Sequence, residues 1–151
     1  MNIVAADPEA RVLSEDEVVA LLGEPIFLRL GMVDEKGWPL VHPVWHVFEG
    51  GVFRLVVGKT STKARVLRAS QRAYFTVDTG EGGHARGVRG RAGVRVIDGD
   101  AGLAVDVCGK ELRKYTGTDQ GAYAEEMLKW ARSGDMSVVE LTPLRFAAFS
   151  Y

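Results

Sequence analysis

The sequence predicts an antiparallel β-barrel with helices on its outside, and three observations lead to this fold class. Strand-like apolar segments follow one another through tight turns, which join neighbouring strands antiparallel. The expected order is a helix, three meandering strands, a short helix, two strands, a pair of helices and a closing strand. No G-x-G-x-x-G motif follows a strand, so a parallel dinucleotide-binding sheet is not expected. The chain should therefore be mainly β with peripheral helices.

Six segments have the composition and alternation of strands. They cover residues 26–33, 38–48, 52–57, 72–78, 85–97 and 137–151. Pro39 and Pro43 cannot donate to a sheet ladder, so the second segment is expected to be interrupted or to lie at an edge. Gly87, Gly90 and Gly93 recur in the fifth segment, where they predict bulges or a close approach of the backbone to another group.

Four segments have helical patterns. They cover residues 14–22, 61–69, 101–115 and 121–131. The first opens with a capping box, in which Ser14 and Glu17 satisfy each other's backbone donors. Residues 1–13 precede it and are expected to form a loose lead-in, so the folded domain is assigned to residues 14–151.

Composition limits the possible functions. The 151 residues suit one domain, and the formal net charge of -1 provides no global basic field for nucleic acid. Cys108 is the single cysteine, which excludes an internal disulfide, fits a cytoplasmic location and is expected to pack as a small apolar residue. Only three histidines occur, and no metal site is expected. No apolar run reaches the length needed to span a bilayer, so no membrane partner is expected.

The segment after residue 58 brings hydroxyls and cations to the point where a strand gives way to a helix. The first N–H groups of a helix lack partners, and the helix dipole favours an anion at that end. A phosphate cradle, most simply for the phosphate of a cofactor, is therefore predicted. Its residues are Lys59, Thr60, Ser61, Thr62 and Lys63. The alternative is an ordinary helix cap followed by a solvated basic face.

Two further groups of cations occur in the chain. They are Arg65, Arg68 and Arg72, which extend the basic run, and Lys110, Arg113 and Lys114, which are expected to form a solvated helix face. A nucleic-acid interface could use the first group, but no aromatic stacking platform is interleaved with it. Nucleic acid is therefore not an expected partner.

Four stretches resemble the pyridoxamine 5'-phosphate oxidase-like family of flavin-binding split barrels, which has a related deazaflavin-binding branch. They are residues 37–45 (GWPLVHPVW), 61–67 (STKARVL), 90–92 (GRA) and 141–146 (LTPLRF). The stretches occur in the family's order, and the resemblance covers residues 14–151. It implies an antiparallel split β-barrel of the FMN-binding type that forms a homodimer with the cofactor at the subunit interface.

The resemblance also implies which residues contact the cofactor. Ser61, Thr62 and Lys63 would hold the phosphate, with Lys59 and Thr60 beside them, while His42, Pro43, Val44 and Trp45 would line the ribityl chain and the ring edge. Arg91 or Arg89 would face the partner subunit's site, and the roles of Arg86 and Arg89 stay open.

The implied function is FMN-dependent oxidation or reduction of a small molecule. The deazaflavin F420 is the alternative cofactor, because Arg65, Arg68 and Arg72 could hold its acidic tail. A non-catalytic protein that stores flavin or haem is the second alternative. The C-terminal Arg and His pattern that true pyridoxamine phosphate oxidases use for substrate is not evident, so vitamin B6 oxidation is not expected. No catalytic side chain is assigned.

Overall fold

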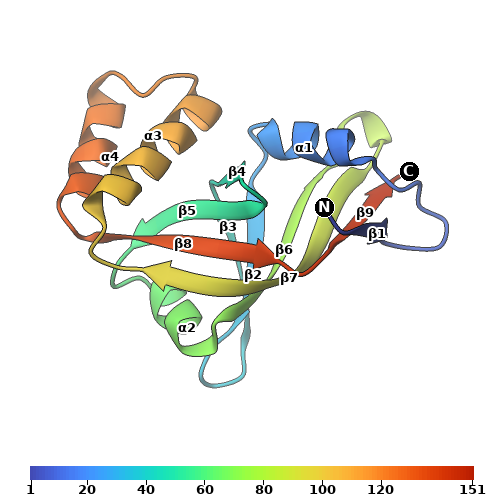
Figure 1. Ribbon diagram of the computed structural model, residues 1–151, viewed down its shortest axis with the longest axis horizontal. Helices are drawn as coiled ribbons and strands as arrows, with labels where there is room; N and C mark the ends of the chain where they lie inside the picture. Colours follow the sequence, from blue (N-terminus) through green and yellow to red (C-terminus); the bar gives the residue numbers. More distant parts are fainter.

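A computed structural model describes all 151 residues, and a single curled sheet dominates it, with helices packed at its edges (Figure 1). The strands are β1 (Ile3–Ala5), β2 (Leu28–Val33), β3 (Pro39–Val44), β4 (Val47–Glu49), β5 (Val52–Gly58), β6 (Arg72–Thr79), β7 (Arg86–Ile97), β8 (Met136–Pro143) and β9 (Phe146–Ser150). The helices are α1 (Glu15–Gly23), α2 (Thr62–Ser70), α3 (Ala101–Thr116) and α4 (Ala122–Arg132), with a 3-10 turn η1 (Glu81–Gly83). The predicted fold class, a mainly antiparallel split barrel with peripheral helices, is confirmed. No helix is both long and apolar enough to cross a membrane.

The long strand β7 divides the sheet into two halves. The strand order is β3-β2-β6-β7-β8-β5-β4, and β9 pairs with β7 and β1. Residues 92–97 of β7 pair with β8, whereas residues 86–89 pair with β9. Because the two ends of one strand pair with different neighbours, the sheet curls into a barrel that is split along β7.

Strand β3 lies at one edge of the sheet and pairs only with β2, as its prolines predict. The segment over residues 38–48 is also interrupted, which is the other arrangement that its prolines predict. The ladder stops at Val44, and Trp45 and His46 pack against α3 before the chain resumes as β4 beside β5. These contacts with the helix replace the ladder hydrogen bonds that a continuous strand would make.

Apolar side chains form two cores. The larger core fills the barrel with 22 buried residues around Phe53, Phe75 and Phe146, whose rings lie 5.0, 5.6 and 6.2 Å apart pairwise. The smaller core of 9 residues joins α3 and α4 to the sheet and includes Cys108. Burial raises the pKa of the Cys108 thiol to about 11, which fits the packing role predicted for it.

The glycines of β7 differ in what they require. A Cβ at Gly87 would lie 2.6 Å from Cβ of Asp78, and one at Gly90 would lie 2.3 Å from the carbonyl oxygen of Arg145, so the predicted close approach is confirmed at both. A Cβ at Gly93 would have no atom within 4 Å. The register with β6 runs through all three positions, so none of them interrupts that ladder.

The N-terminal residues are more ordered than the expected loose lead-in. Strand β1 pairs in parallel with β9, and Leu13 is buried in the barrel core. A three-residue strand carries too little alternation to be recognised from sequence, and its position depends on a partner more than 140 residues away.

Candidate functional site

The start of α2 presents free backbone donors. Ser61 is the N-cap, and its hydroxyl accepts a hydrogen bond from the N–H of Ala64 at 3.2 Å. The first intrahelical bond runs from the N–H of Arg65 to the carbonyl of Ser61. The N–H groups of Thr62 and Lys63 precede that bond and are therefore available to an anion. Capping and anion binding are compatible here, because they use different donors.

The cations around this helix fall into two groups. Arg65 pairs with Glu35 at 2.7 Å across to the β2–β3 turn, and Arg68 pairs with Asp98 at 2.7 Å. Lys59 and Lys63 have no acidic partner. The two lysines that flank the free N–H groups therefore form no ion pair, although the charge of Lys59 contributes to the lowered pKa of Asp98.

Arg68 is a structural residue. Its Nη2 donates to the carbonyl of Lys59 at 2.8 Å and to Asp98, and its guanidinium holds the pKa of Asp98 at about 2, with help from the Ser137 hydroxyl. These bonds join α2 to the end of β5, to β8 and to the link between β7 and α3. Arg68 is therefore already bound to groups of the protein, whereas from the sequence it was a candidate ligand for the acidic tail of F420.

His42 is close enough to Lys63 for the charge of that lysine to act on it. It pairs with Leu30 in the ladder and so shares the inner face of β3 with Leu40 and Val44, which pack against the barrel core. Burial and the charge of Lys63 both lower the pKa of His42, which keeps its imidazole neutral. Of the residues predicted to line the cofactor, His42 is thus brought to the start of α2.

The other predicted residues of this stretch lie in different surroundings. Pro43 is exposed on the outer face of β3, opposite Arg29. Trp45 is half-buried beyond the end of β3, where its ring stacks on Tyr115 at 5.0 Å between centroids. Thr60 and Lys59 are exposed in the turn before α2. A Cβ at the preceding Gly58 would lie 3.6 Å from the ring of Trp130.

A groove of about 1100 Å³ runs beside α2, and neither Thr62 nor Lys63 of the predicted phosphate cradle lines it. The helix, the β2–β3 hairpin and the start of β6 form its sides. Arg91 of β7 is the one residue predicted to contact FMN that lines it, and Arg65 and Arg72, considered for the tail of F420, line it as well. Arg89 does not line the groove, because it pairs with Asp7 at 3.3 Å and lies over the ring of Phe149. Arg86 pairs with Glu24 at 2.8 Å.

A buried polar cluster that the sequence analysis did not detect ties α3 to the barrel. The ammonium of Lys114 donates to the carbonyls of Leu22 at 2.7 Å and of His46 at 3.0 Å, and it lies 3.3 Å from Nε2 of His46. His46 is fully buried. The prediction of a solvated helix face is wrong for Lys114, because the link between β3 and β4 covers that side of the helix.

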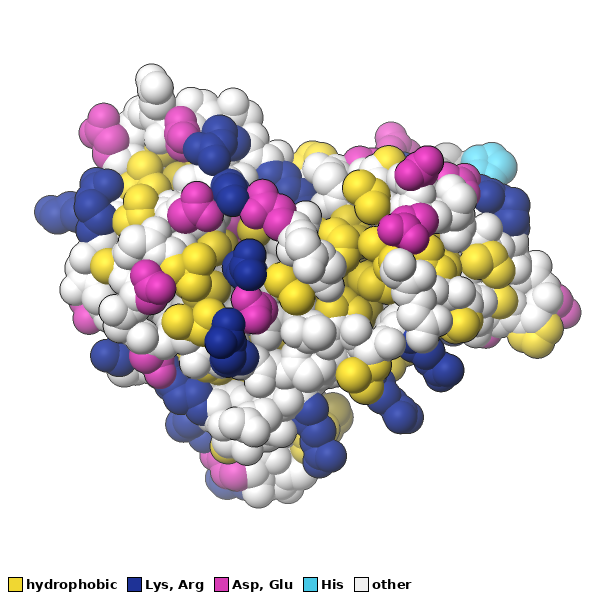
Figure 2. Space-filling view, in the orientation of Figure 1, with side chains coloured by type: hydrophobic (Ala, Val, Ile, Leu, Met, Phe, Trp, Pro, Cys, Tyr) yellow, Lys and Arg dark blue, Asp and Glu magenta, His cyan; other side chains and the backbone are white.

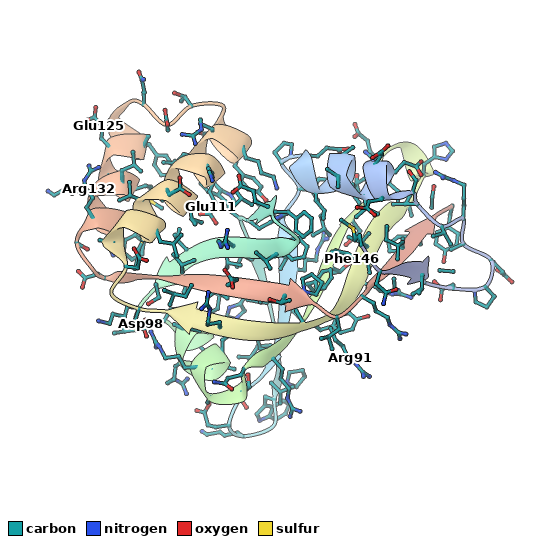
Figure 3. The ribbon with its side chains drawn as sticks, in the orientation of Figure 1. Arg91, Asp98, Glu111, Glu125, Arg132 and Phe146 are labelled. Carbon is teal, nitrogen blue, oxygen red and sulfur yellow. The ribbon has the colours of Figure 1, made fainter.

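Glu111 belongs to the same cluster. Figure 3 shows it on α3, between that helix and β5, where it accepts a hydrogen bond from the N–H of Val56 at 3.3 Å. Burial raises the pKa of Glu111 to about 8, lowers that of Lys114 to about 8 and lowers that of His46 to about 3. No signal short of the tertiary contacts could have identified these residues, since each is common on solvated helices or in turns.

The charges of the face in Figure 2 are mixed. Lys and Arg side chains alternate with Asp and Glu and with apolar side chains, and no large area carries one sign. A nucleic-acid interface would need a continuous basic surface, which this face does not offer.

Comparison with known proteins identifies the family. The sequence matches the pyridoxamine 5'-phosphate oxidase family over residues 14–149. The chain belongs to this family. No curated protein sequence matches it.

Solved structures with the same fold have names that indicate different roles. A conserved hypothetical protein from Mycobacterium tuberculosis has a TM-score of 0.79 at 19% identity, over 95% of this chain and 88% of that one. An F420 reductase has a TM-score of 0.65 at 19% identity, over 84% and 93%. The haem storage protein HutZ from Vibrio cholerae has a TM-score of 0.67 at 17% identity, over 87% and 90%. At these identities the similarity shows the fold, and the activity must be argued from the site.

Proposed function

We propose that this protein is an FMN-dependent oxidoreductase that acts on a small molecule. The observation that carries the proposal is the pair of lysines without acidic partners, Lys59 and Lys63, beside the free N–H groups at the start of α2. Family membership supports it, because the family includes flavin-binding enzymes. The donor set fits a phosphate, which accepts strong hydrogen bonds from ammonium and backbone N–H groups.

The chain's own residues have two tasks in this proposal. The N–H groups of Thr62 and Lys63 and the ammonium groups of Lys59 and Lys63 bind the phosphate. His42, neutral and near Lys63, and Trp45, held against Tyr115, orient the ribityl chain and the ring edge. A bound flavin would supply the hydride chemistry, so the protein needs no acidic or basic side chain of its own for that step.

F420 remains the alternative cofactor, and the charges of α2 bear on it. The acidic tail of F420 would need cations beyond the phosphate cradle. Arg68 is held by Asp98, and Arg65 is paired with Glu35, which leaves Arg72 as the free cation of the three. This distribution favours the shorter FMN.

A homodimer is part of the proposal. Val33, Trp38 and Val41 of the β2–β3 hairpin are 57%, 68% and 66% exposed, which is a large apolar surface for a monomer. A second copy of the chain would cover this surface and enclose the cofactor. A cytoplasmic location, inferred from the single cysteine, stays a prediction.

The first test is the absorption spectrum of the freshly purified protein, with mass spectrometry of any released chromophore. FMN in the preparation, or micromolar binding of added FMN, would support the proposal. F420 or haem in its place would assign the site to the alternative cofactor. A colourless protein that binds neither flavin would refute it, and bound flavin that no reductant or oxidant can turn over would indicate storage.

A further inference from the structure

Two arginines without acidic partners lie in the groove beside α2. Elsewhere on the sheet, arginines are neutralised: Arg29 pairs with Asp78, Arg54 and Arg95 with Glu140, Arg86 with Glu24 and Arg89 with Asp7. Arg72 and Arg91 line the groove and have no such partner. Figure 3 shows Arg91 extending from β7 out of the sheet.

The ladder places these two arginines on one face, with Tyr74 as a neighbour of both. Tyr74 of β6 pairs with Arg91 of β7, and Arg72 pairs with Gly93. Side chains alternate along a strand, so Arg72, Tyr74 and Arg91 project from the same face. Diagonal neighbours in such a ladder lie about 7–8 Å apart, within reach of two arginines that bind one carboxylate.

Two glycines flank Tyr74; a Cβ at Gly31 would lie 3.4 Å from Cβ of Tyr74, whereas Gly93 leaves open space. Gly31 of β2 pairs with Tyr74 on one side, and Gly93 lies diagonally across on the other. A Cβ at Gly93 would meet no atom within 4 Å. Larger residues at these two positions would cover the tyrosine ring, which is instead 46% exposed.

Apolar side chains border this space. Val41 pairs with Gly31 at the β3 edge, and Leu144, whose N–H donates to the carbonyl of Arg91 at 2.9 Å, lies at the β8–β9 bend. Both are about two-thirds exposed, at 66% and 67%. The space therefore has an aromatic floor, apolar borders and two unpaired cations on one side, while Asp34 and the Arg65–Glu35 ion pair also line the groove.

We propose that Arg72, Tyr74 and Arg91 form the substrate-recognition site, and that the substrate is a flat, apolar molecule that carries a carboxylate. The ring of such a molecule lies against Tyr74 over Gly31, and its carboxylate accepts hydrogen bonds from the guanidinium groups. This proposal extends the proposed function. It rests on that function for the statement that the bound molecule is a substrate. Binding uses the groove, and its border at Val41 also belongs to the surface that the proposed dimer covers.

The test compares two probes that differ only in charge, cinnamate and its neutral amide cinnamamide. Binding is measured by calorimetry and by ligand-observed NMR on the intact protein. Cinnamate should bind more tightly than cinnamamide. R72Q and R91Q should each weaken cinnamate binding about ten- to hundredfold, as expected for loss of a charged hydrogen bond, and leave cinnamamide unchanged.

Two further variants keep the test interpretable. G93V places a side chain in the open space, where its Cβ meets no atom within 4 Å, and should block both probes. R132Q removes an arginine of α4 that also lacks an acidic partner and should block neither. K63A should lose FMN affinity and keep cinnamate affinity, so failure of the flavin proposal and failure of this one are distinguishable.

Three outcomes would overturn the proposal. Equal affinity of the two probes would show that the site does not recognise the carboxylate charge. Unchanged cinnamate binding in R72Q and R91Q would show that these arginines do not belong to the site. Dissociation of a wild-type dimer by R72Q or R91Q in sedimentation velocity, with cinnamate binding intact, would assign the arginines to contact between copies.

Discussion

The rings of Trp45 and Tyr115 lie parallel, with centroids 5.0 Å apart and planes inclined by 3°. Tyr115 belongs to α3, and its hydroxyl donates to the carbonyl of Ile26 at 2.8 Å and accepts from the N–H of His46 at 3.3 Å. One side chain thus joins α3 to the segment before β2 and to the link between β3 and β4. The position of Trp45, and hence of the proposed ring-binding edge, depends on this helix.

Y115F should destabilise the protein while preserving the stack. The phenyl ring can still lie against Trp45, but the carbonyl of Ile26 and the N–H of His46 both lose a partner. We expect the free energy of unfolding to fall by about 1–3 kcal/mol. Urea denaturation measures this, with Y123F as the control, since Tyr123 is 57% exposed on α4. If Y115F and Y123F unfold at the same urea concentration, the hydroxyl has no structural role.

Glu111 should make the protein less stable as the pH rises from about 5 to about 8. Burial raises its pKa from 4.5 to about 8, so in this window the native state holds a proton that the unfolded chain has released. Where the native state binds more protons, the free energy of unfolding falls with rising pH. E111Q keeps a neutral side chain at the site and should be more stable than the wild type at pH 8.

The measurement is the difference in unfolding free energy between wild type and E111Q at several pH values. His46 and Lys114, whose pKa values are lowered to about 3 and about 8, are present in both proteins. Their contributions, in which stability rises with pH below 6.5 and again above 8, therefore largely cancel in the difference. A difference that does not vary with pH would show that Glu111 is ionised in the native state.

Local signals account for the parts of the fold that were predicted. The capping box at Ser14 and the prolines of β3 act within a few residues, and both are found as expected. The sequence also predicts a hydroxyl cap at the start of α2 from Thr60, Ser61 or Thr62, and Ser61 provides it. The proposed phosphate cradle also lies within one short segment, which is why sequence alone could identify it as a candidate.

The remaining features depend on contacts between distant segments. Lys114 is buried because residues 22 and 46 meet one side of α3, and Arg72 and Arg91 meet because of the β6–β7 register. The periodicity of a helix shows that it has two sides, but it does not show which lysine will be covered by another element. For the same reason, Arg68 could be read as a free ligand until its contact with Asp98 was seen.

K63A should weaken FMN binding by about 1.5–3 kcal/mol if the ammonium of Lys63 contacts the phosphate. A fluorescence titration of the folded variant measures this. K36A is the matched control, because Lys36 is an exposed lysine of the β2–β3 turn without an acidic partner. Unchanged affinity in K63A would remove Lys63 from the site.

S61A separates capping from binding. The hydroxyl of Ser61 accepts from the N–H of Ala64, so its loss should cost about 1 kcal/mol of stability. The N–H groups of Thr62 and Lys63 stay in place, and FMN affinity should therefore fall less than in K63A. A larger loss of affinity in S61A than in K63A would mean that the hydroxyl itself binds the phosphate.

Gly90 and Gly93 offer a matched pair of substitutions in β7. A Cβ at Gly90 would lie 2.3 Å from the carbonyl oxygen of Arg145 and 3.1 Å from the ring of Phe75, so G90A must push β7 away from the β8–β9 bend. We expect a loss of about 1–3 kcal/mol, the usual cost of overpacking. G93A meets nothing and restricts the unfolded chain, so its stability should be unchanged or slightly higher. Thermal and urea denaturation compare the two, and equal losses in G90A and G93A would mean that strand propensity, and not the approach of Arg145, requires glycine at residue 90.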